Sequence, residues 1–170
     1  AKLIESARMN ERFVPGICFP ELLRVTADPL TAMEDADIVM FVVPSRSLRE
    51  NAVRFGPFIE PASNVLSATK GLELTTLMRM SQVLAEELPD SVQSRICVLS
   101  GPNLAVEIAA GKPSSTVVGS SNPEVAASVQ AILNSAVFRV YTNDDIVGVE
   151  LCGALKNIIA LGAGICDGLR

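Results

Sequence analysis

Residues 37–43 read D-I-V-M-F-V-V, an apolar run without the alternation of a half-buried strand. Such a run is typical of a strand that is covered on both faces, as in a parallel sheet. Similar short runs follow at 64–68 and 95–99, and helical patterns lie between them at 45–54 and 74–88. Strands that alternate with helices predict an α/β fold with a mostly parallel, doubly wound sheet.

The alternation continues on both sides of these elements. Upstream, the sequence predicts a helix over 2–12 and a short edge strand over 24–26. Downstream, it predicts a helix over 102–110, a strand over 115–118, a helix over 123–133 capped by Asn122, and a strand over 137–141. We therefore expect one α/β domain over residues 1–142, and we expect residues 143–170 to begin an all-helical second domain.

One long apolar helix follows the last predicted strand. We expect Asn143 to cap this helix, which reaches residue 162 or beyond. Residues 146–166 are almost long enough to cross a bilayer, but Glu150 and Lys156 lie inside the stretch. Each charge near the centre of a membrane span costs about 2.5–3.5 kcal/mol. The pattern therefore predicts a buried helix of a soluble protein and no membrane insertion.

The composition argues against several classes of protein and site. With 49% hydrophobic residues, the 170 residues suffice for a packed core, so we do not expect disorder. The net charge of -5, without a dense run of Lys and Arg, argues against a nucleic-acid partner. The sequence has no histidine and its four cysteines are scattered. This pattern predicts no metal site and favours buried free thiols in a reducing, cytoplasmic compartment.

Three of the predicted strands end in residues that are typical of ligand sites. They run into the turns V-P-S at 43–45, T-K-G-L at 69–72 and S-G-P-N at 100–103. In open α/β sheets, ligands bind at the carboxyl ends of the strands. If the three strands are parallel, these turns meet at one edge of the sheet and form one ligand site.

Two lysines are candidate functional residues. Lys70 follows a strand and precedes Gly71, so its cation could hold a phosphate or a carbonyl oxygen; a solvated surface lysine is the alternative. Lys156 lies in the apolar stretch L-C-G-A-L-K-N-I-I-A, and burial would lower its pKa toward the range of proton transfer. A lysine whose stem reaches to the surface is the alternative there. Asn157 adds a polar group beside Lys156, and Gly153 leaves room for a ligand.

Taken in order, these motifs resemble those of the NAD(P)-dependent glycerol-3-phosphate dehydrogenase family, bacterial type. The matching stretches are N-x-x-F-V-P-G at 10–16, V-P-S at 43–45, K-G-L-E at 70–73, S-G-P-N at 100–103 with Ala105 and Glu107, F-R-V-Y-T at 138–142, G-V-E-L at 148–151 and G-A-L-K-N at 153–157. Asn103 stands where the family has Ser or Thr, and Cys152 stands where glycine is common. The ordered series covers essentially the whole chain and is therefore specific.

The resemblance implies an oxidoreductase that interconverts dihydroxyacetone phosphate and sn-glycerol 3-phosphate with NAD or NADP, NADPH being favoured for the bacterial type. The product feeds glycerophospholipid synthesis. By the same resemblance, Lys156 exchanges the proton at the substrate's C2 oxygen, and Lys70 contacts both substrate and cofactor. The other residues implied are Gly101, Asn103 and Asn157 for the substrate, and Pro44, Ser45 and Ala105 for the cofactor.

The resemblance also implies that the chain is a fragment, with an incomplete, NAD(P)-binding Rossmann-like domain over residues 1–142 and the truncated start of a helical substrate domain over residues 143–170. The family's glycine fingerprint belongs upstream of Lys2, and the ligands of the substrate phosphate belong downstream of Arg170. We therefore expect little or no activity from this chain alone. The alternatives are a related 3-hydroxyacid or ketopantoate-type dehydrogenase and a non-catalytic nucleotide-binding or interaction module. The choice between NAD and NADP and the oligomeric state stay open, a homodimer included.

Overall fold

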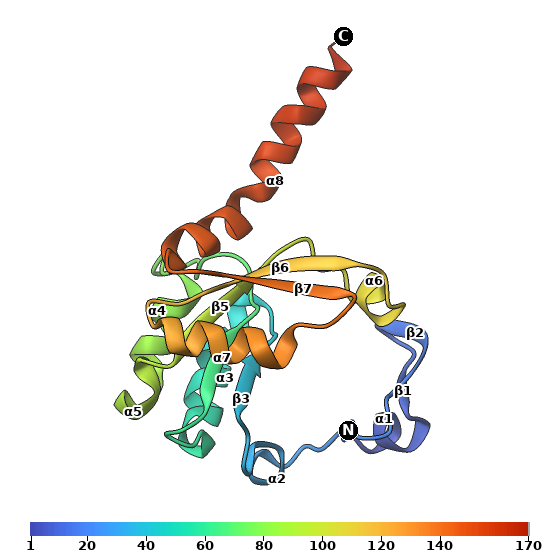
Figure 1. The fold of residues 1–170 in the computed structure, drawn as a ribbon, viewed down its shortest axis with the longest axis vertical. Coiled ribbons are helices and arrows are strands. Elements are labelled where there is room, and N and C mark those ends of the chain that lie inside the picture. The colour runs from blue at the N-terminus through green and yellow to red at the C-terminus, as the bar shows by residue number, and fades with distance from the viewer. Residues whose placement is uncertain (170) are drawn as a thin grey trace.

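A five-stranded sheet forms the centre of the molecule in a computed structural model that describes residues 1–169 (Figure 1). The strands lie side by side in chain order: β3 (Ile38–Phe41), β4 (Asn64–Ser67), β5 (Ile96–Ser100), β6 (Ser114–Gly119) and β7 (Phe138–Asn143). All neighbours are parallel except β5 and β6, which are antiparallel. The prediction of an α/β fold with a mostly parallel sheet is confirmed.

Helices cover both faces of the sheet, and a separate core cluster lies under each layer. On one face, α3 (Leu48–Phe55) and α4 (Met80–Glu87) pack on residues that include Val65 of β4. On the other face, α7 (Pro123–Leu133) packs on residues that include Leu66 of β4. Both strand residues are fully buried. Burial of such a side chain stabilises the fold by about 1.5–3 kcal/mol, which explains the continuous apolar runs of the sequence.

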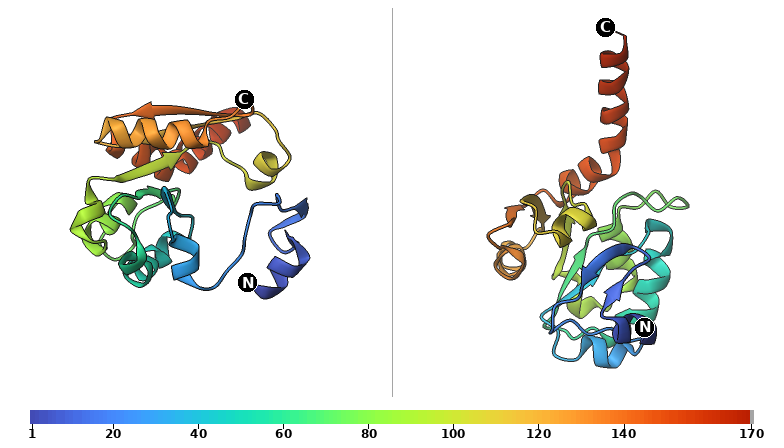
Figure 2. Two further views of the ribbon diagram at one scale, coloured as in Figure 1. Left: turned by 60° about the horizontal axis from the view of Figure 1, so that its bottom comes forward. Right: turned by 90° about the vertical axis from the view of Figure 1, so that its right-hand side faces the viewer.

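The last helix, α8 (Ile146–Gly168), begins on the α3 and α4 face and then leaves the body. Its first turns lie against β5 and β6, where Val149 contacts Gly119. In Figure 2, α7 and the start of α8 lie on opposite sides of the strands, and the rest of α8 projects into solvent. Because α8 runs along β5, it carries Lys156 past the edge where that strand ends.

Shorter elements connect the layers and the N-terminal region. They are α1 (Lys2–Ala7), β1 (Met9–Asn10), β2 (Val14–Cys18), α2 (Pro29–Met33), the 3-10 turns η1 (Ser45–Ser47) and η2 (Gly56–Phe58), α5 (Asp90–Gln93) and α6 (Ala105–Ala109). The prediction that Asn122 caps α7 is confirmed, since its side chain accepts a hydrogen bond from the Glu124 N–H at 3.0 Å.

Two predictions for the N-terminal region were wrong. The helix over 2–12 ends at Ala7 because Arg8 adopts a left-handed conformation with φ of 54°, and an antiparallel β1–β2 pair follows. The strand over 24–26 does not form. Instead, the Arg8 guanidinium binds the carbonyl oxygens of Pro20, Glu21 and Leu23. This side chain therefore holds the segment where strand pairing was expected.

Three helix starts were also predicted too early. The helix over 74–88 begins only at Met80, because the preceding residues fold back: Leu77 has φ of 59° and the Glu73 N–H donates to the Met78 carbonyl oxygen. The helix over 102–110 begins at Ala105. The cap of α8 is Asp145, whose Oδ1 accepts from the Gly148 N–H at 2.8 Å, while Asn143 is the last residue of β7.

The expectation of buried thiols and of a buried last helix was largely wrong. Of the four cysteines, Cys97 is buried and the others are exposed. Within α8 only Gly153 is buried. By length and composition α8 could cross a membrane, with a mean hydropathy of 1.6 over its most apolar window. The reason for the exposure is geometric: beyond Gly153, α8 projects past the edge of the sheet, away from the other elements of residues 1–169.

Candidate functional site

The three predicted turns meet at one edge of the sheet. Because β3, β4 and β5 are parallel, their carboxyl ends share this edge. Thr69 joins two of the turns, since its hydroxyl donates to the Val43 carbonyl oxygen at 2.9 Å. The predicted meeting of the turns at one edge is therefore confirmed, and their role as one ligand site stays a prediction.

Lys70 joins the second turn to the third. Its Nζ donates a hydrogen bond to the Gly101 carbonyl oxygen at 2.7 Å, although the side chain is otherwise exposed. Partial burial lowers the pKa of this ammonium below its usual 10.5, and the nearby charge of Lys156 lowers it further. Gly101, the partner of Lys70, lines the same cavity as Lys156, so the two lysines lie near one region of the sheet edge.

Gly101 is the residue of the third turn that tolerates no side chain. A Cβ at this position would lie 2.7 Å from the Ser115 carbonyl oxygen and 2.9 Å from the Thr116 Cα. Both are backbone atoms of β6, which cannot move away easily. The glycine therefore lets the turn lie directly on β6, and its own carbonyl oxygen stays available to Lys70.

Lys156 is exposed, so of the two alternatives that the sequence left open the structure shows the lysine that reaches the surface. Its Nζ donates to the Asn157 Oδ1 at 3.2 Å. The apolar residues that flank it in sequence, Leu155, Ile158 and Ile159, are exposed as well. An apolar neighbourhood in sequence is therefore not an apolar neighbourhood in space at this point of α8.

Two hollows border the third turn, and each is lined by one of the two lysines. One, the open cleft, has a volume of about 590 Å³ and lies beside the ends of β3 and β4; its lining includes Pro44, Ser45, Lys70, Asn103 and Ala105. The other, the helix cavity, has a volume of about 560 Å³ and lies between the third turn and α8. Its lining includes Ser100, Gly101, Cys152, Gly153 and Lys156.

The structure thus divides the predicted site residues into two groups. Pro44, Ser45 and Ala105 share the open cleft with Lys70, whereas Gly101 and Lys156 share the helix cavity. Asn103 lies with the first group. Asn157 borders neither hollow and lines the outer part of α8.

Asn103 presents an unused acceptor. Its Nδ2 donates to the Thr116 hydroxyl at 2.9 Å, and that hydroxyl donates to the Ser100 carbonyl oxygen at 3.0 Å. The Asn103 Oδ1 is buried and has no hydrogen-bond partner among residues 1–169. A buried acceptor without a partner is costly, so this oxygen is a candidate for a ligand contact.

Sequence reasoning missed Glu150, which fastens α8 to the body. Its carboxylate is almost fully buried and accepts hydrogen bonds from Arg79 and Ser81. The signal that could have revealed it was an acidic residue in an apolar helix, because buried carboxylates need partners.

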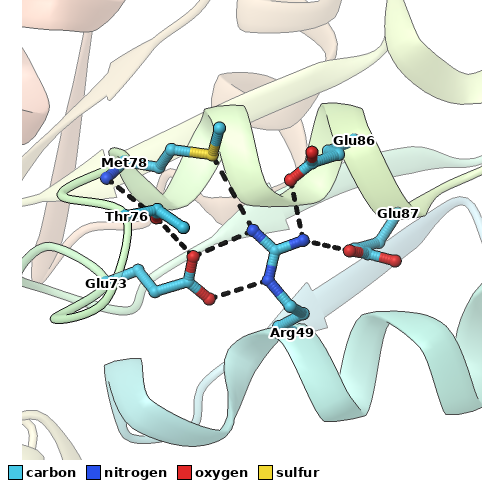
Figure 3. Close-up of polar contacts among 6 residues, drawn as sticks. All are labelled: Arg49, Glu73, Thr76, Met78, Glu86 and Glu87. Carbon is cyan, nitrogen blue, oxygen red and sulfur yellow. Dashed lines mark hydrogen bonds and ion pairs between the residues drawn. The ribbon is translucent and has the colours of Figure 1, made fainter.

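A second missed cluster surrounds Arg49 on α3 (Figure 3). Its guanidinium binds the Glu73 carboxylate through two hydrogen bonds of 2.8 and 2.9 Å, and it also contacts Glu86 and Glu87 of α4. The bonds from Arg49, and then from Thr76, lower the pKa of Glu73 to about 2. Glu73 ends the K-G-L-E motif, so this cluster ties the segment after Lys70 to both helices.

Comparison with known proteins identifies the family. The sequence model described as the N-terminus of NAD-dependent glycerol-3-phosphate dehydrogenase matches residues 1–126, and the corresponding C-terminus model matches residues 145–170. This chain belongs to the NAD-dependent glycerol-3-phosphate dehydrogenase family. The family that the motifs indicated is therefore confirmed.

Relatives show how much of the dehydrogenase this chain represents. Glycerol-3-phosphate dehydrogenase [NAD(P)+] of Dehalococcoides mccartyi strain 195 is 46% identical over 99% of this chain and 47% of its own length. That of Streptomyces avermitilis is 44% identical over 99% of this chain and 50% of its own length. The chain thus spans about half the length of these curated relatives.

Solved structures support the fold. The glycerol-3-phosphate dehydrogenase of Coxiella burnetii superposes with a TM-score of 0.84 at 35% identity, covering 99% of this chain and 50% of that one. A ketopantoate reductase from Ralstonia eutropha reaches a TM-score of 0.55 at 19% identity, over 75% of this chain and 40% of that one. The latter shares the fold only, since its identity is low.

Proposed function

We propose that this dehydrogenase interconverts dihydroxyacetone phosphate and sn-glycerol 3-phosphate with NAD(P)H. The observation that carries the proposal is the convergence of Lys70 and Lys156 at the edge of the sheet, where Lys70 binds the Gly101 carbonyl oxygen at 2.7 Å and Gly101 lines the same cavity as Lys156. Two cations suit a carbonyl oxygen that gains negative charge. The names of the relatives support the substrate and the cofactor. The related 3-hydroxyacid and ketopantoate-type activities are the alternative.

Each hollow takes a separate part of the reaction in this proposal. The helix cavity holds the triose phosphate, where Lys156 gives the proton to the C2 oxygen during reduction and removes it during oxidation. Gly101 borders the substrate there, and Asn157 orients the Lys156 ammonium through its hydrogen bond. Asn103 lines the open cleft, so in this proposal its Oδ1 contacts the substrate from the cofactor side, where the two hollows approach each other.

The lining of the open cleft suits a nicotinamide cofactor. Met40, Val42 and Leu99 offer apolar surface for a ring, while Ser45 and Lys70 offer polar groups. We propose that Pro44, Ser45, Lys70 and Ala105 hold NAD or NADP, with NADPH favoured. The bound cofactor supplies the hydride. Lys70 also contacts the substrate, because it lies where the two hollows approach each other.

The proposal also covers the setting of the enzyme. The dehydrogenase is a cytoplasmic enzyme that supplies glycerol 3-phosphate for glycerophospholipid synthesis, and a homodimer is the assembly we propose. We propose that α8 does not insert into a membrane, because Glu150 and Lys156 lie well inside it. The division into two domains at residue 142 remains a prediction. The separate N-terminus and C-terminus family models, which match residues 1–126 and 145–170, support it.

A substrate comparison tests the function. A polypeptide of the relatives' length that contains these residues is assayed for NADPH oxidation with dihydroxyacetone phosphate, unphosphorylated dihydroxyacetone and ketopantoate. We expect turnover with the phosphorylated triose and at least about 100-fold lower kcat/KM with the others. Comparable turnover with ketopantoate, or none with the triose phosphate, would contradict the proposal.

A further inference from the structure

Glu150 makes the main polar connection between α8 and the rest of the molecule. Its side chain is 7% exposed, and it accepts from the Arg79 Nη1 at 2.5 Å, the Ser81 N–H at 2.8 Å and the Ser81 hydroxyl at 2.6 Å. A buried ion pair adds little net stability, because desolvation offsets the attraction. Its short, directional bonds nevertheless restrict the geometry of the two segments that they join.

Arg79 belongs to the same loop as Lys70. We call residues 68–79 the Lys70 loop. Residues 72–79 of the loop fold back on themselves: Leu72 forms an antiparallel bridge with Arg79, and the Glu73 N–H donates to the Met78 carbonyl oxygen at 2.9 Å. The loop therefore carries Lys70 at one end and the partner of Glu150 at the other.

The position of Lys156 depends on contacts made by residues that precede it in α8. Gly153 sits so close to Ser100 that an added Cβ would lie 2.5 Å from the Ser100 Oγ. Beyond Gly153, the described residues of α8 are largely exposed. The position of the Lys156 ammonium is therefore determined by how the preceding turns are fastened, and a small rotation there moves it relative to Lys70.

We propose that Glu150, Arg79 and Ser81 are positioning residues, which fix α8 on the Lys70 loop and so set the spacing of the two lysine ammonium groups. This inference rests on the proposed function of those lysines. None of the three residues lines the open cleft or the helix cavity. They act on the reaction through Lys70 and Lys156, and a loss of spacing slows proton transfer without preventing cofactor binding.

The test uses Glu150→Gln and Ser81→Ala in the polypeptide of the relatives' length. The matched control is Glu86→Gln, which removes one exposed partner of Arg49 on α4, the same helix as Ser81, and leaves Glu73 and Glu87 in place. For each variant, kcat and KM for dihydroxyacetone phosphate, the dissociation constant of NADPH and Tm are measured.

We expect kcat to fall on the order of 10- to 100-fold in Glu150→Gln, and less in Ser81→Ala, since misplacement by about 1 Å costs up to about 100-fold. NADPH affinity changes less than about twofold in both, and Glu86→Gln keeps its kcat. An unchanged kcat in Glu150→Gln, or equal losses of kcat and NADPH affinity, overturns the inference. The absence of triose phosphate turnover in the unmodified protein would instead refute the proposed function.

Discussion

The Lys70 loop and the outer part of α8, which carry the two central lysines, differ in how many contacts hold them to the rest of the protein. The Lys70 loop is tied to β3, to the turn after β5, to α3 and to α8. The side chains that make these connections are Thr69, Lys70, Glu73 and Arg79. Lys156, by contrast, is exposed, and the hydrogen bond of its ammonium goes to its own neighbour, Asn157. The body of the protein thus fixes one lysine firmly, while the other depends on the anchoring of a helix.

Substitution of the lysines gives the largest expected effects. Lys156→Met should lower kcat about 10²- to 10⁴-fold, because general acid–base catalysis contributes that range. Lys70→Met should lower kcat/KM about 10²- to 10³-fold and also weaken NADPH binding, since this residue contributes electrostatic stabilisation from the loop. Steady-state kinetics in the polypeptide of the relatives' length measure both.

The control for these variants is Lys112→Met, which removes an exposed lysine with a 3.7 Å ion pair to Glu107. Exposed pairs of this kind contribute little, so its kinetics should match the unmodified protein. If Lys156→Met kept more than about a tenth of the original kcat, the proposed role of Lys156 in proton transfer would be wrong.

Gly101→Ala tests how closely the third turn, which binds Lys70, packs on the backbone of β6. The added Cβ would meet two backbone atoms of β6, so β5 and β6 must shift. Overpacking of this kind costs about 1–3 kcal/mol, and we expect the free energy of unfolding in urea to fall by that amount. Gly162→Ala is the matched control, because its added Cβ meets nothing within 4 Å. Equal stabilities of the two variants would show that the third turn is not held closely.

The Arg49 cluster predicts a smaller effect, on pH dependence. The pKa of Glu73 falls from 4.5 to about 2 in the folded state, so its ion pair stabilises the fold above pH 4.5 and this contribution is lost between pH 4.5 and about 2. Arg49→Met should make the decline of Tm over that range shallower. Denaturation at a series of pH values measures the slopes. Parallel slopes would mean that Arg49 does not anchor the loop.

Much of the fold was predictable because burial on both faces leaves a strong pattern. The strands containing Val39, Val65 and Val98 were found from their apolar runs, and the edge that their turns share followed from parallel pairing. The predictions were wrong where a single side chain or a single backbone angle determines where an element begins or ends. Arg8 ends α1 and holds the segment expected to be a strand, and Leu77 delays the start of α4.

The site was predictable as a set of residues but not as an arrangement. The motifs named Lys70, Gly101 and Lys156, which the structure brings to one edge of the sheet. The helical pattern could not show that Lys156 is exposed, because its burial depends on what lies beyond the edge of the sheet. Glu150 was missed for a related reason: its partners, Arg79 and Ser81, are about 70 residues away in sequence.

The most direct test of the account is the pKa of Lys70, measured by NMR of isotope-labelled lysine side chains. The account predicts a pKa below the usual 10.5 that rises in Lys156→Met, because the variant removes the neighbouring positive charge. The pKa should not change in Lys112→Met. An unchanged Lys70 pKa in Lys156→Met would show that the two lysines do not share one site and would contradict the central claim.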